Sequence, residues 1–356
     1  MKVIKVGSDF SGVGAFDYAI GRVAENKVFK VQTVYACDWD KYARITYAHN
    51  HGEPPYYPKD VYEREIPSES LDIYVSSPPC QAFSMAGRRL GKEDKRGILF
   101  FNSHEFIQKN KPRFFIFENV KGLLSDDGGK TFSEWINMLG GKSVNGLPVL
   151  FPYEDSVPYH VYWKVLNSKE HGVPQNRERV FIIGIRDDHD NNFRFPIEEH
   201  LTKRLRDVFE NQVDDKYFLS EKMLSYLETR SDNFNTGKIN YRTENDYATT
   251  LTKSSGSIDI SDNIIIHNIY GGFNENEARI FTKYSPTIRT AKGGGHIPSV
   301  IEDYKIRKLT PRECFRLQDF PDTFDFSVVS DSQAYKQAGN SITVRVLEKI
   351  IANLPL

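Results

Sequence analysis

The chain has 356 residues, of which 39% are hydrophobic and 27% are charged, as expected for a globular protein with one large domain and a smaller one. The chain contains no run of about 18 apolar residues, which excludes a membrane-spanning helix. Its first residues lack the apolar core of a secretory signal. The formal net charge is −1. A nucleic-acid-binding protein with this balance must gather its basic residues on one surface.

The three cysteines, Cys37, Cys80 and Cys314, lie far apart without a Cys-x-x-Cys pair. This spacing excludes a disulfide framework and a thiolate zinc site, and it is typical of a protein in a reducing compartment. We therefore expect a cytoplasmic protein without a metal centre.

The first half of the chain alternates short apolar runs with amphipathic stretches. The apolar runs predict strands at 3–6, 31–36, 71–75, 114–117 and 180–185, and helical periodicity occurs at 16–24, 41–50, 98–109 and 132–139. Such alternation predicts a mostly parallel, doubly wound α/β sheet of the Rossmann-like type, covered on both faces. Ligands bind these sheets at the carboxyl ends of the strands, so the residues after each strand are the first candidates for a site.

From about residue 195 the composition shifts to Asn, Thr, Ser, Asp, Gly and Tyr, and helical periodicity fades until Thr310. This region is too long for one loop and predicts a separate, irregular, β-rich domain. A last helix at 344–351 has the apolar spacing needed to pack back on the sheet. The predicted division is 1–195 with 335–356 as the large domain, and 196–334 as the smaller one.

The strand at 71–75 runs into Ser76-Ser77-Pro78-Pro79-Cys80. The two prolines fix the backbone directly after the strand and present Cys80 at the ligand edge of the sheet. A reactive thiolate needs nearby positive charge or aligned amides to lower its pKa. An isolated cysteine is more often a small buried apolar residue, but this setting favours a nucleophile, whereas Cys37 and Cys314 lack such a setting.

A glycine-bounded loop, 87–97, follows Cys80 and holds five basic residues against two acidic ones. Glycine at both ends suits a segment that moves, and the positive charge suits phosphate contact. A solvated charged loop is the alternative. The position directly after Cys80 favours a closing loop that faces DNA.

The strand at 114–117 ends in Glu118, and a carboxylate there is costly to bury unless it is paired or protonated. A raised pKa is what a general acid needs. Another strand is preceded by Gln175-Asn176-Arg177-Glu178-Arg179, in which two arginines spaced by two residues share one strand face. A surface ion-pair ladder is the alternative for these arginines.

The segment from Asp9 to Phe16 is a glycine-rich turn between a strand and a helix. It is not the Gly-x-Gly-x-x-Gly of dinucleotide binders, because Asp17 stands in the third glycine position, and this counts against a nicotinamide dehydrogenase. Asp38 follows the second strand, where an acidic residue accepts hydrogen bonds from ribose hydroxyls.

With these residues assembled, the chain resembles the cytosine-C5 DNA methyltransferase family, of the bacterial restriction-modification or phage type, almost from end to end. The strings that match, in family order, are the turn at 10–14, Asp38-Trp39, Asp60-Val61, Pro79-Cys80-Gln81, Glu118-Asn119-Val120, Gln175-x-Arg177-x-Arg179, the structural motif at 307–318 and Gly339-Asn340-Ser341-Ile342. Ala15 and Asp319 each stand where the family usually has glycine.

The resemblance implies three groups of site residues. The catalytic residues would be Cys80, Glu118, Arg177 and Arg179. Binding of S-adenosyl-L-methionine, which leaves as S-adenosyl-L-homocysteine, would involve Phe10, Ser11, Gly12, Val13, Gly14, Asp38, Trp39, Asp60, Val61, Pro79, Leu99, Asn340 and Ser341. DNA contacts would come from Gln81, Ser84, Arg88, Arg89, Lys92, Thr250, Thr287, Arg289, Lys292 and Gly294.

In the implied reaction, the Cys80 thiolate attacks carbon 6 of a flipped cytosine, Glu118 bonds or protonates N3, and Arg179 with Arg177 bonds O2. Sequence recognition would lie between about 194 and 300, with Thr287-Ile288 as the first candidate for the family's Thr-aliphatic pair and Thr250-Leu251 as the second. The implied partner is double-stranded DNA, bound by a monomer without a membrane, and a separately acting cognate restriction endonuclease is left open.

Two other functions fit parts of this pattern. One branch of the family methylates transfer RNA with the same motifs, but the long insertion between Arg179 and Arg307 favours DNA, since sequence readout needs that surface. A non-catalytic DNA-binding regulator is the other, and the joint presence of Cys80, Glu118 and Arg179 counts against it.

The resemblance yields a direct prediction for Cys80. Replacing it in the variant Cys80→Ala should abolish methyl transfer while specific DNA binding survives, because only the covalent step is lost. Methyl-transfer assays beside DNA-binding titrations test this, and normal methylation by the variant would contradict the scheme.

Overall fold

The computed structural model describes residues 1–79, 98–189, 192–218, 220, 241–242, 245–248, 250–251, 264–266 and 306–356. Its main sheet has the strand order β2-β1-β3-β4-β8-β7-β5-β6, and a smaller sheet has the order β11-β10-β9. The strands are β1 (Val3–Asp9), β2 (Lys30–Cys37), β3 (Ile73–Ser76), β4 (Phe114–Val120), β5 (Ser143–Val144), β6 (Leu147–Pro148), β7 (Tyr159–Asn167), β8 (Glu178–Arg186), β9 (Tyr241–Arg242), β10 (Ile264–Ile266) and β11 (Ile306–Lys308).

The described α-helices confirm the five that periodicity predicts and add two more. They are α1 (Ala15–Lys27), α2 (Lys41–His51), α4 (Ile98–Asn110), α5 (Lys130–Leu139), α7 (Pro311–Arg316), α8 (Asp331–Asn340) and α9 (Val344–Ala352). Short 3₁₀ segments are η1 (Lys121–Gly129), η2 (Ser168–His171), η3 (Leu205–Val208) and η4 (Asp215–Tyr217). Strands β5, β6 and β7 and helices α7 and α8 are not among the predicted elements. Helix α8 is polar and lacks a long apolar stripe.

The sheet is mixed, which corrects the mostly parallel sheet expected from the sequence. Strands β2, β1, β3 and β4 are parallel to one another, but β8 runs antiparallel to both β4 and β7. The chain between β7 and β8 contains only the short η2, not a crossover helix, and a connection of that kind returns the strand in the opposite direction.

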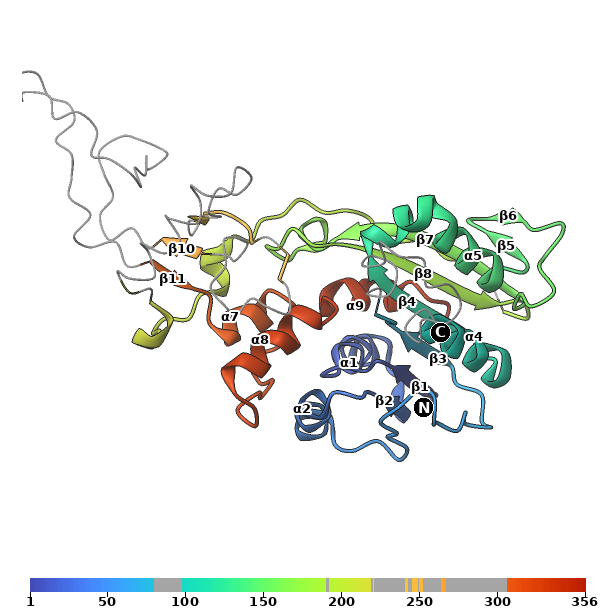
Figure 1. Ribbon diagram of the computed structural model, residues 1–356, viewed down its shortest axis with the longest axis horizontal. Helices are drawn as coiled ribbons and strands as arrows, with labels where there is room; N and C mark the ends of the chain where they lie inside the picture. Colours follow the sequence, from blue (N-terminus) through green and yellow to red (C-terminus); the bar gives the residue numbers. More distant parts are fainter. Residues whose placement is uncertain are drawn as a thin grey trace, which may run out of the picture.

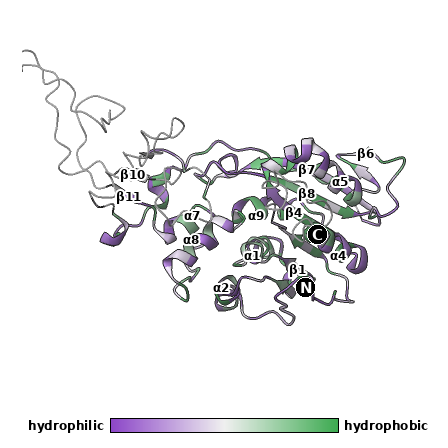
Figure 2. Ribbon diagram, viewed as in Figure 1, coloured by the Kyte–Doolittle hydropathy of each residue, from purple (hydrophilic) through white to green (hydrophobic). Residues whose placement is uncertain are grey.

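Helices cover both faces of the sheet, as predicted. Along β4, Phe114 and Ile116 belong to the core beneath α1 and α9, whereas Phe115 and Phe117 belong to the core beneath α4 and α5. Burial on both faces explains why this strand is an unbroken apolar run rather than an alternating one. Figure 1 shows α9, from the end of the chain, lying beside α1, and Figure 2 shows hydrophobic residues concentrated in the strands.

The structural motif at 307–318 is built around a buried ion pair. Arg307 donates to both carboxylate oxygens of Glu313 at 2.7 and 2.8 Å, and both side chains are fully buried. Glu313 also accepts from the backbone of Thr310, whose hydroxyl accepts in turn from the Glu313 amide, and this capping box starts α7. Phe315 of the same helix belongs to the core shared with α1 and α9.

Within the part of the chain that the structure describes, no helix is long and apolar enough to cross a membrane. Within the predicted domain at 196–334 the structure describes η3, η4, the small sheet, α7 and the start of α8. This domain division stays a prediction.

The fold yields a prediction about acid stability. His171 is fully buried, and neither ring nitrogen has a hydrogen-bond partner among the described residues. Burial, with help from Lys349, lowers the pKa of His171 to about 4. Because the unfolded chain binds this proton more readily, the free energy of unfolding should fall as pH drops from about 6.5 towards 4, by about 3 kcal/mol in total.

His171→Phe should therefore lose less stability between pH 7.5 and pH 4.5 than the wild type, since no buried proton acceptor remains. Denaturant unfolding at both pH values measures the change in unfolding free energy for each protein. The packing cost of the larger ring is the same at both pH values and cancels in this change. His200→Phe, at an exposed position, serves as control. Equal pH dependence of wild type and His171→Phe would contradict the prediction.

Candidate active site

The ends of four parallel strands form one row across the sheet. In the pairing register, Cys37 of β2 lies beside Asp9 of β1, Asp9 beside Ser76 of β3, and Ser76 beside Phe117 of β4. The residues that come next are the ones the sequence analysis selected. The sheet therefore brings the glycine turn, Asp38, the segment before Cys80 and Glu118 to one edge.

The turn after β1 is shaped by left-handed backbone conformations. Phe10, Gly12 and Gly14 have φ values of 56°, 55° and 86°. A side chain at Gly14 would place its Cβ 2.1 Å from the His51 ring, so both the backbone conformation and the space require glycine there. Gly12 turns its amide to the Asp38 carboxylate, with a nitrogen–oxygen distance of 2.7 Å.

Asp38 is held in place by backbone amides on both oxygens. Its Oδ2 accepts from Gly12 and its Oδ1 accepts from the amide of Asp40, at 2.9 Å. Burial raises the pKa of Asp38 against the lowering effect of these amides. The adjacent Trp39 is 86% exposed, so its indole is a free aromatic face beside an acceptor.

The other residues predicted to bind a cofactor have different environments. Asp60 accepts from the amide of Tyr62 at 2.9 Å, and Val61 is buried. Leu99 is half-buried in the first turn of α4, and Pro79 is exposed at the end of the segment that follows β3. At the end of α8, Asn340 is exposed and Ser341 is buried.

Glu118 and Arg179 form an ion pair between β4 and β8. The Arg179 Nε lies 3.0 Å from Glu118 Oε1, and the two side chains are 15% and 9% exposed. The antiparallel register sets Val120 opposite Arg179, so Glu118 and Arg179 are diagonal neighbours on one face. Burial raises the pKa of Glu118, opposed by Arg179 and Arg177. The pair combines a carboxyl group that gains protons easily with a fixed cation.

Asn119 connects this pair to the segment that carries Cys80. Its side-chain amide donates to the carbonyl of Pro78 at 3.0 Å, and its carbonyl oxygen accepts from the amide of Val120 at 2.8 Å. Cys80 lies outside the described residues, as do the predicted DNA contacts Gln81, Ser84, Arg88, Arg89, Lys92, Thr287, Arg289, Lys292 and Gly294.

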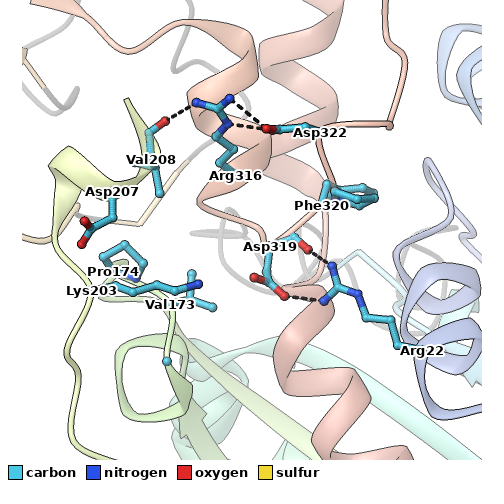
Figure 3. A pocket seen from close by; sticks show the side chains of 12 residues that line it. Arg22, Val173, Pro174, Lys203, Asp207, Val208, Arg316, Asp319, Phe320 and Asp322 are labelled. Atoms are coloured by element: carbon cyan, nitrogen blue, oxygen red, sulfur yellow. Dashed lines mark hydrogen bonds and ion pairs between the residues drawn. The ribbon is translucent and has the colours of Figure 1, made fainter. Parts of the chain in front are cut away.

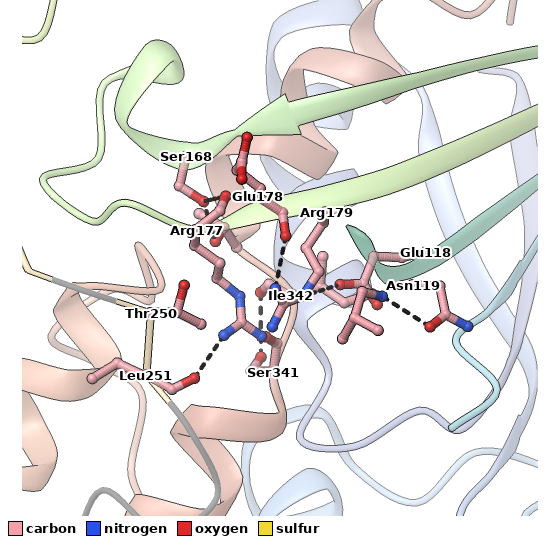
Figure 4. A network of polar contacts seen from close by, with 12 residues as sticks. Glu118, Asn119, Ser168, Arg177, Glu178, Arg179, Thr250, Leu251, Ser341 and Ile342 are labelled. Atoms are coloured by element: carbon pink, nitrogen blue, oxygen red, sulfur yellow. Dashed lines mark hydrogen bonds and ion pairs between the residues drawn. The ribbon is translucent and has the colours of Figure 1, made fainter. Parts of the chain in front are cut away.

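Arg177 lies one residue before β8, and its contacts differ from those of Arg179. Its guanidinium donates to the carbonyl oxygens of Leu251, Gly339 and Ser341 at 2.9, 3.1 and 2.8 Å, and the side chain is buried (Figure 4). Burial and the neighbouring Arg179 lower its pKa. The structure thus places Arg177 at a junction between the start of β8, residue Leu251 and the segment that ends α8.

Thr250, a predicted DNA contact, belongs to the same junction. Its hydroxyl donates to the carbonyl of Asn176 at 2.8 Å, and Ala248 forms an isolated bridge with Gln175. Gln175 is fully buried and donates to the carbonyl of Leu317 at 2.8 Å. In the described structure the Thr250 side chain thus bonds the backbone of the residue before Arg177.

A polar cavity of about 310 Å³ lies beside α1, the segment before Gln175 and the segment after α7. Figure 3 shows two ion pairs at this cavity, Arg22 with Asp319 and Arg316 with Asp322, and Lys203 and Asp207 also line it. Asp319 has a φ of 59°, which explains why glycine suits this position, and the bonds from Arg22 to its carboxylate and carbonyl hold the Asp in that conformation. We assign no ligand to this cavity.

The fold belongs to a class that solved methyltransferase structures share. A DNMT2 mutant of Spodoptera frugiperda superposes with a TM-score of 0.70 at 20% identity, covering 98% of each chain. Dnmt2 of S. pombe gives a TM-score of 0.65 at 18% identity, covering 98% of this chain and 97% of that one.

Sequence comparison identifies the family. The model for C-5 cytosine-specific DNA methylases matches residues 4–355. The type II methyltransferase M.Bsp6I of Bacillus sp. (strain RFL6) is 30% identical over 99% of this chain and 98% of its own length. M.SsoII of Shigella sonnei is 35% identical over 97% of this chain and 79% of its own length. The chain belongs to the C-5 cytosine-specific DNA methylase family and is a DNA (cytosine-5-)-methyltransferase.

Some residues that bond the backbone near the predicted site are not predicted by the sequence. Arg44 and Arg64 donate to backbone carbonyls near the predicted ligand residues, yet neither stands directly after a strand in an unusual composition. Their partners are mostly carbonyl oxygens, which carry no residue-type signal. Only the tertiary structure shows them.

The two arginines of the Gln-x-Arg-x-Arg motif should respond differently to substitution. Arg177→Met leaves three carbonyls without their donor, so the free energy of unfolding should fall by about 3 kcal/mol or more. Arg179→Met should mainly lower kcat, by about 100-fold or more, because Arg179 is the donor beside Glu118. Thermal unfolding and single-turnover methyl transfer measure the two effects.

Arg186→Met provides the control, because Arg186 lies at the far end of β8 and pairs with the exposed Asp188. Arg186→Met should lower the thermal stability less than Arg177→Met does, and the rate of methyl transfer less than Arg179→Met does. Identical profiles for the Arg177 and Arg179 variants would contradict the division of roles.

Proposed function

We propose that this enzyme transfers a methyl group from S-adenosylmethionine to carbon 5 of a cytosine flipped out of a short specific sequence in double-stranded DNA, through a covalent bond between Cys80 and carbon 6. The observation that carries the proposal is the buried Glu118–Arg179 pair, 3.0 Å apart, at the edge where Asn119 bonds the segment before Cys80. A base must leave the stack to reach such a pair.

The residues around the turn at 10–14 fit the proposed cofactor. The hydroxyls of Ser11 and Tyr57 are buried there without a hydrogen bond of normal geometry among the described residues, so the edge has polar atoms to offer a ligand. Trp39 has an exposed aromatic face, and Asp38 is fixed by two amides. In this arrangement the Trp39 ring would contact adenine, and the Asp38 carboxylate would accept hydrogen bonds from the ribose hydroxyls. When bound, S-adenosylmethionine supplies an electrophilic methyl group on its sulfonium.

The protein residues activate the cytosine. Carbon 5 of cytosine is a weak nucleophile, and a bond from the Cys80 thiolate to carbon 6 raises electron density at carbon 5. The negative charge that develops at N3 and O2 meets a proton held by Glu118 and a donor from Arg179. The raised pKa of Glu118 suits this role. Loss of the carbon-5 proton after methylation breaks the carbon–sulfur bond and releases Cys80.

We further propose a monomer that acts in the cytoplasm on double-stranded DNA. Its relatives include the type II methyltransferase M.HpaII of Haemophilus parainfluenzae and the orphan methyltransferase M.SPRI of Bacillus phage SPR. The enzyme would either protect DNA from a separately acting cognate endonuclease or act alone. Recognition would use the region between about 194 and 300.

The test is bisulfite sequencing of a mixed-sequence duplex DNA library after incubation with the protein and S-adenosylmethionine. We expect protected cytosines in one short sequence context, which also gives the recognition site. Glu118→Gln should lower protection at limiting time by about 100-fold or more, because Gln offers no proton to N3. Glu178→Gln is the matched control, since Glu178 is adjacent to Arg179 but pairs with Lys121 near the surface.

Protection without any sequence preference would overturn the recognition part of the proposal. Methylation of transfer RNA but not of duplex DNA, in a parallel assay with a labelled methyl group, would overturn the choice of substrate. A Glu178→Gln variant as impaired as Glu118→Gln would overturn the role of the pair.

A further inference from the structure

The segment at 57–64 carries Asp60 and Val61, two of the predicted cofactor contacts, but it forms no strand or α-helix. Its start is placed by the sheet, because Tyr56 bridges to Tyr35 of β2 and accepts from the amide of Ala36 at 3.1 Å. After Tyr56 the backbone leaves the sheet, so its carbonyl groups need other donors.

Arg44 of α2 supplies those donors at the first end of the segment. Its guanidinium donates to the carbonyl oxygens of Tyr57 and Pro58, both at 2.8 Å, and to that of Asp38 at 3.4 Å. The guanidinium carbon also lies 3.7 Å from the centroid of the Tyr57 ring. One planar cation thus joins the end of β2, where Asp38 and Trp39 begin, to the segment that leads to Asp60.

Arg64 holds the other end from inside the protein. It donates to the carbonyl of Val61 at 2.8 Å and to that of Asn102 in α4 at 2.9 Å. Its charge is balanced by Asp9 at the end of β1, with Nη2 to Oδ2 at 2.8 Å, and both side chains are almost completely buried. Asp9 also accepts from the hydroxyl of Tyr74 at 2.5 Å.

We propose that Arg44 is a positioning residue for the cofactor's adenosine half: with Arg64 at the opposite end, it fixes the 57–64 segment at the spacing from Asp38 and Trp39 that adenine requires. This inference rests on the proposed use of S-adenosylmethionine. Arg44 touches neither the reacting atoms nor the cofactor contacts' side chains, and acts through the backbone. A segment that is already ordered costs less entropy when the cofactor binds. Loss of Arg44 should therefore weaken cofactor binding and leave the chemical step unchanged.

The test compares Arg44→Gln with wild type in calorimetric titration with S-adenosylhomocysteine. We expect the Kd to rise about tenfold or more, as one lost charged contact of ~1.4 kcal/mol would give. The KM for S-adenosylmethionine should rise similarly, while kcat at saturating cofactor and the KM for DNA stay within about twofold. A purely structural defect would lower the amount of active enzyme and hence kcat.

Two further variants sharpen the result. Arg44→Lys keeps the charge but loses the planar fork that reaches two adjacent carbonyls, so its Kd should also rise at least fivefold. If Arg44→Gln does not fold, the Kd of Arg44→Lys tests the inference in its place. Lys41→Gln removes a positive charge from the same helix at an exposed position and should bind as wild type does. Arg64 is left intact, because its removal would bury the Asp9 carboxylate unpaired.

The inference fails if Arg44→Gln and Arg44→Lys bind S-adenosylhomocysteine within about twofold of wild type, if Lys41→Gln is weakened equally, or if the loss falls on kcat at saturating cofactor. A wild-type protein that does not bind S-adenosylhomocysteine overturns the proposed cofactor instead. The two failures are therefore distinguishable in one set of titrations.

Discussion

The parallel register of β2, β1, β3 and β4 is the constraint on which the site depends. Because parallel strands all end at the same edge, Cys37, Asp9, Ser76 and Phe117 form one row, and the residues that follow them meet beyond it. A slip of one residue in any pair would turn that strand's side chains to the opposite face and break both cores. The apolar side chains that fix the register therefore also fix the spacing between Asp38 and Glu118.

The reversal at β8 matters as much as the parallel strands. In a wholly parallel sheet the beginning of β8 would lie at the opposite edge from the end of β4, and Arg179 would be a strand length away from Glu118. Because β8 is antiparallel to β4, its amino end reaches the ligand edge and Arg179 pairs with Glu118. An arginine at the start of β8 thus reaches the edge formed by the carboxyl ends of the parallel strands.

Arginine side chains that bond carbonyl oxygens join segments far apart in the chain. Arg44 and Arg64 hold the segment near the cofactor edge, and Arg177 joins the start of β8 to residues 251, 339 and 341. A guanidinium suits this task because its five donors lie in one plane and reach several carbonyls at once. Each of these three arginines donates to a backbone carbonyl that lies far from it in the sequence.

The sequence by itself determined the local features: the apolar strands, the five amphipathic helices, the glycine turn, Asp38 after β2 and Glu118 directly after the apolar run of β4. These follow from periodicity and from residue type, which are properties of neighbours in the chain. The motifs in family order also determined the family. The direction of β8, the partners of Arg177 and the contacts of Arg44 and Arg64 were decided only by the tertiary structure. Strand direction depends on how β7 and β8 pair across the sheet, and backbone carbonyls are the same at every residue, so neither leaves a signature in the sequence.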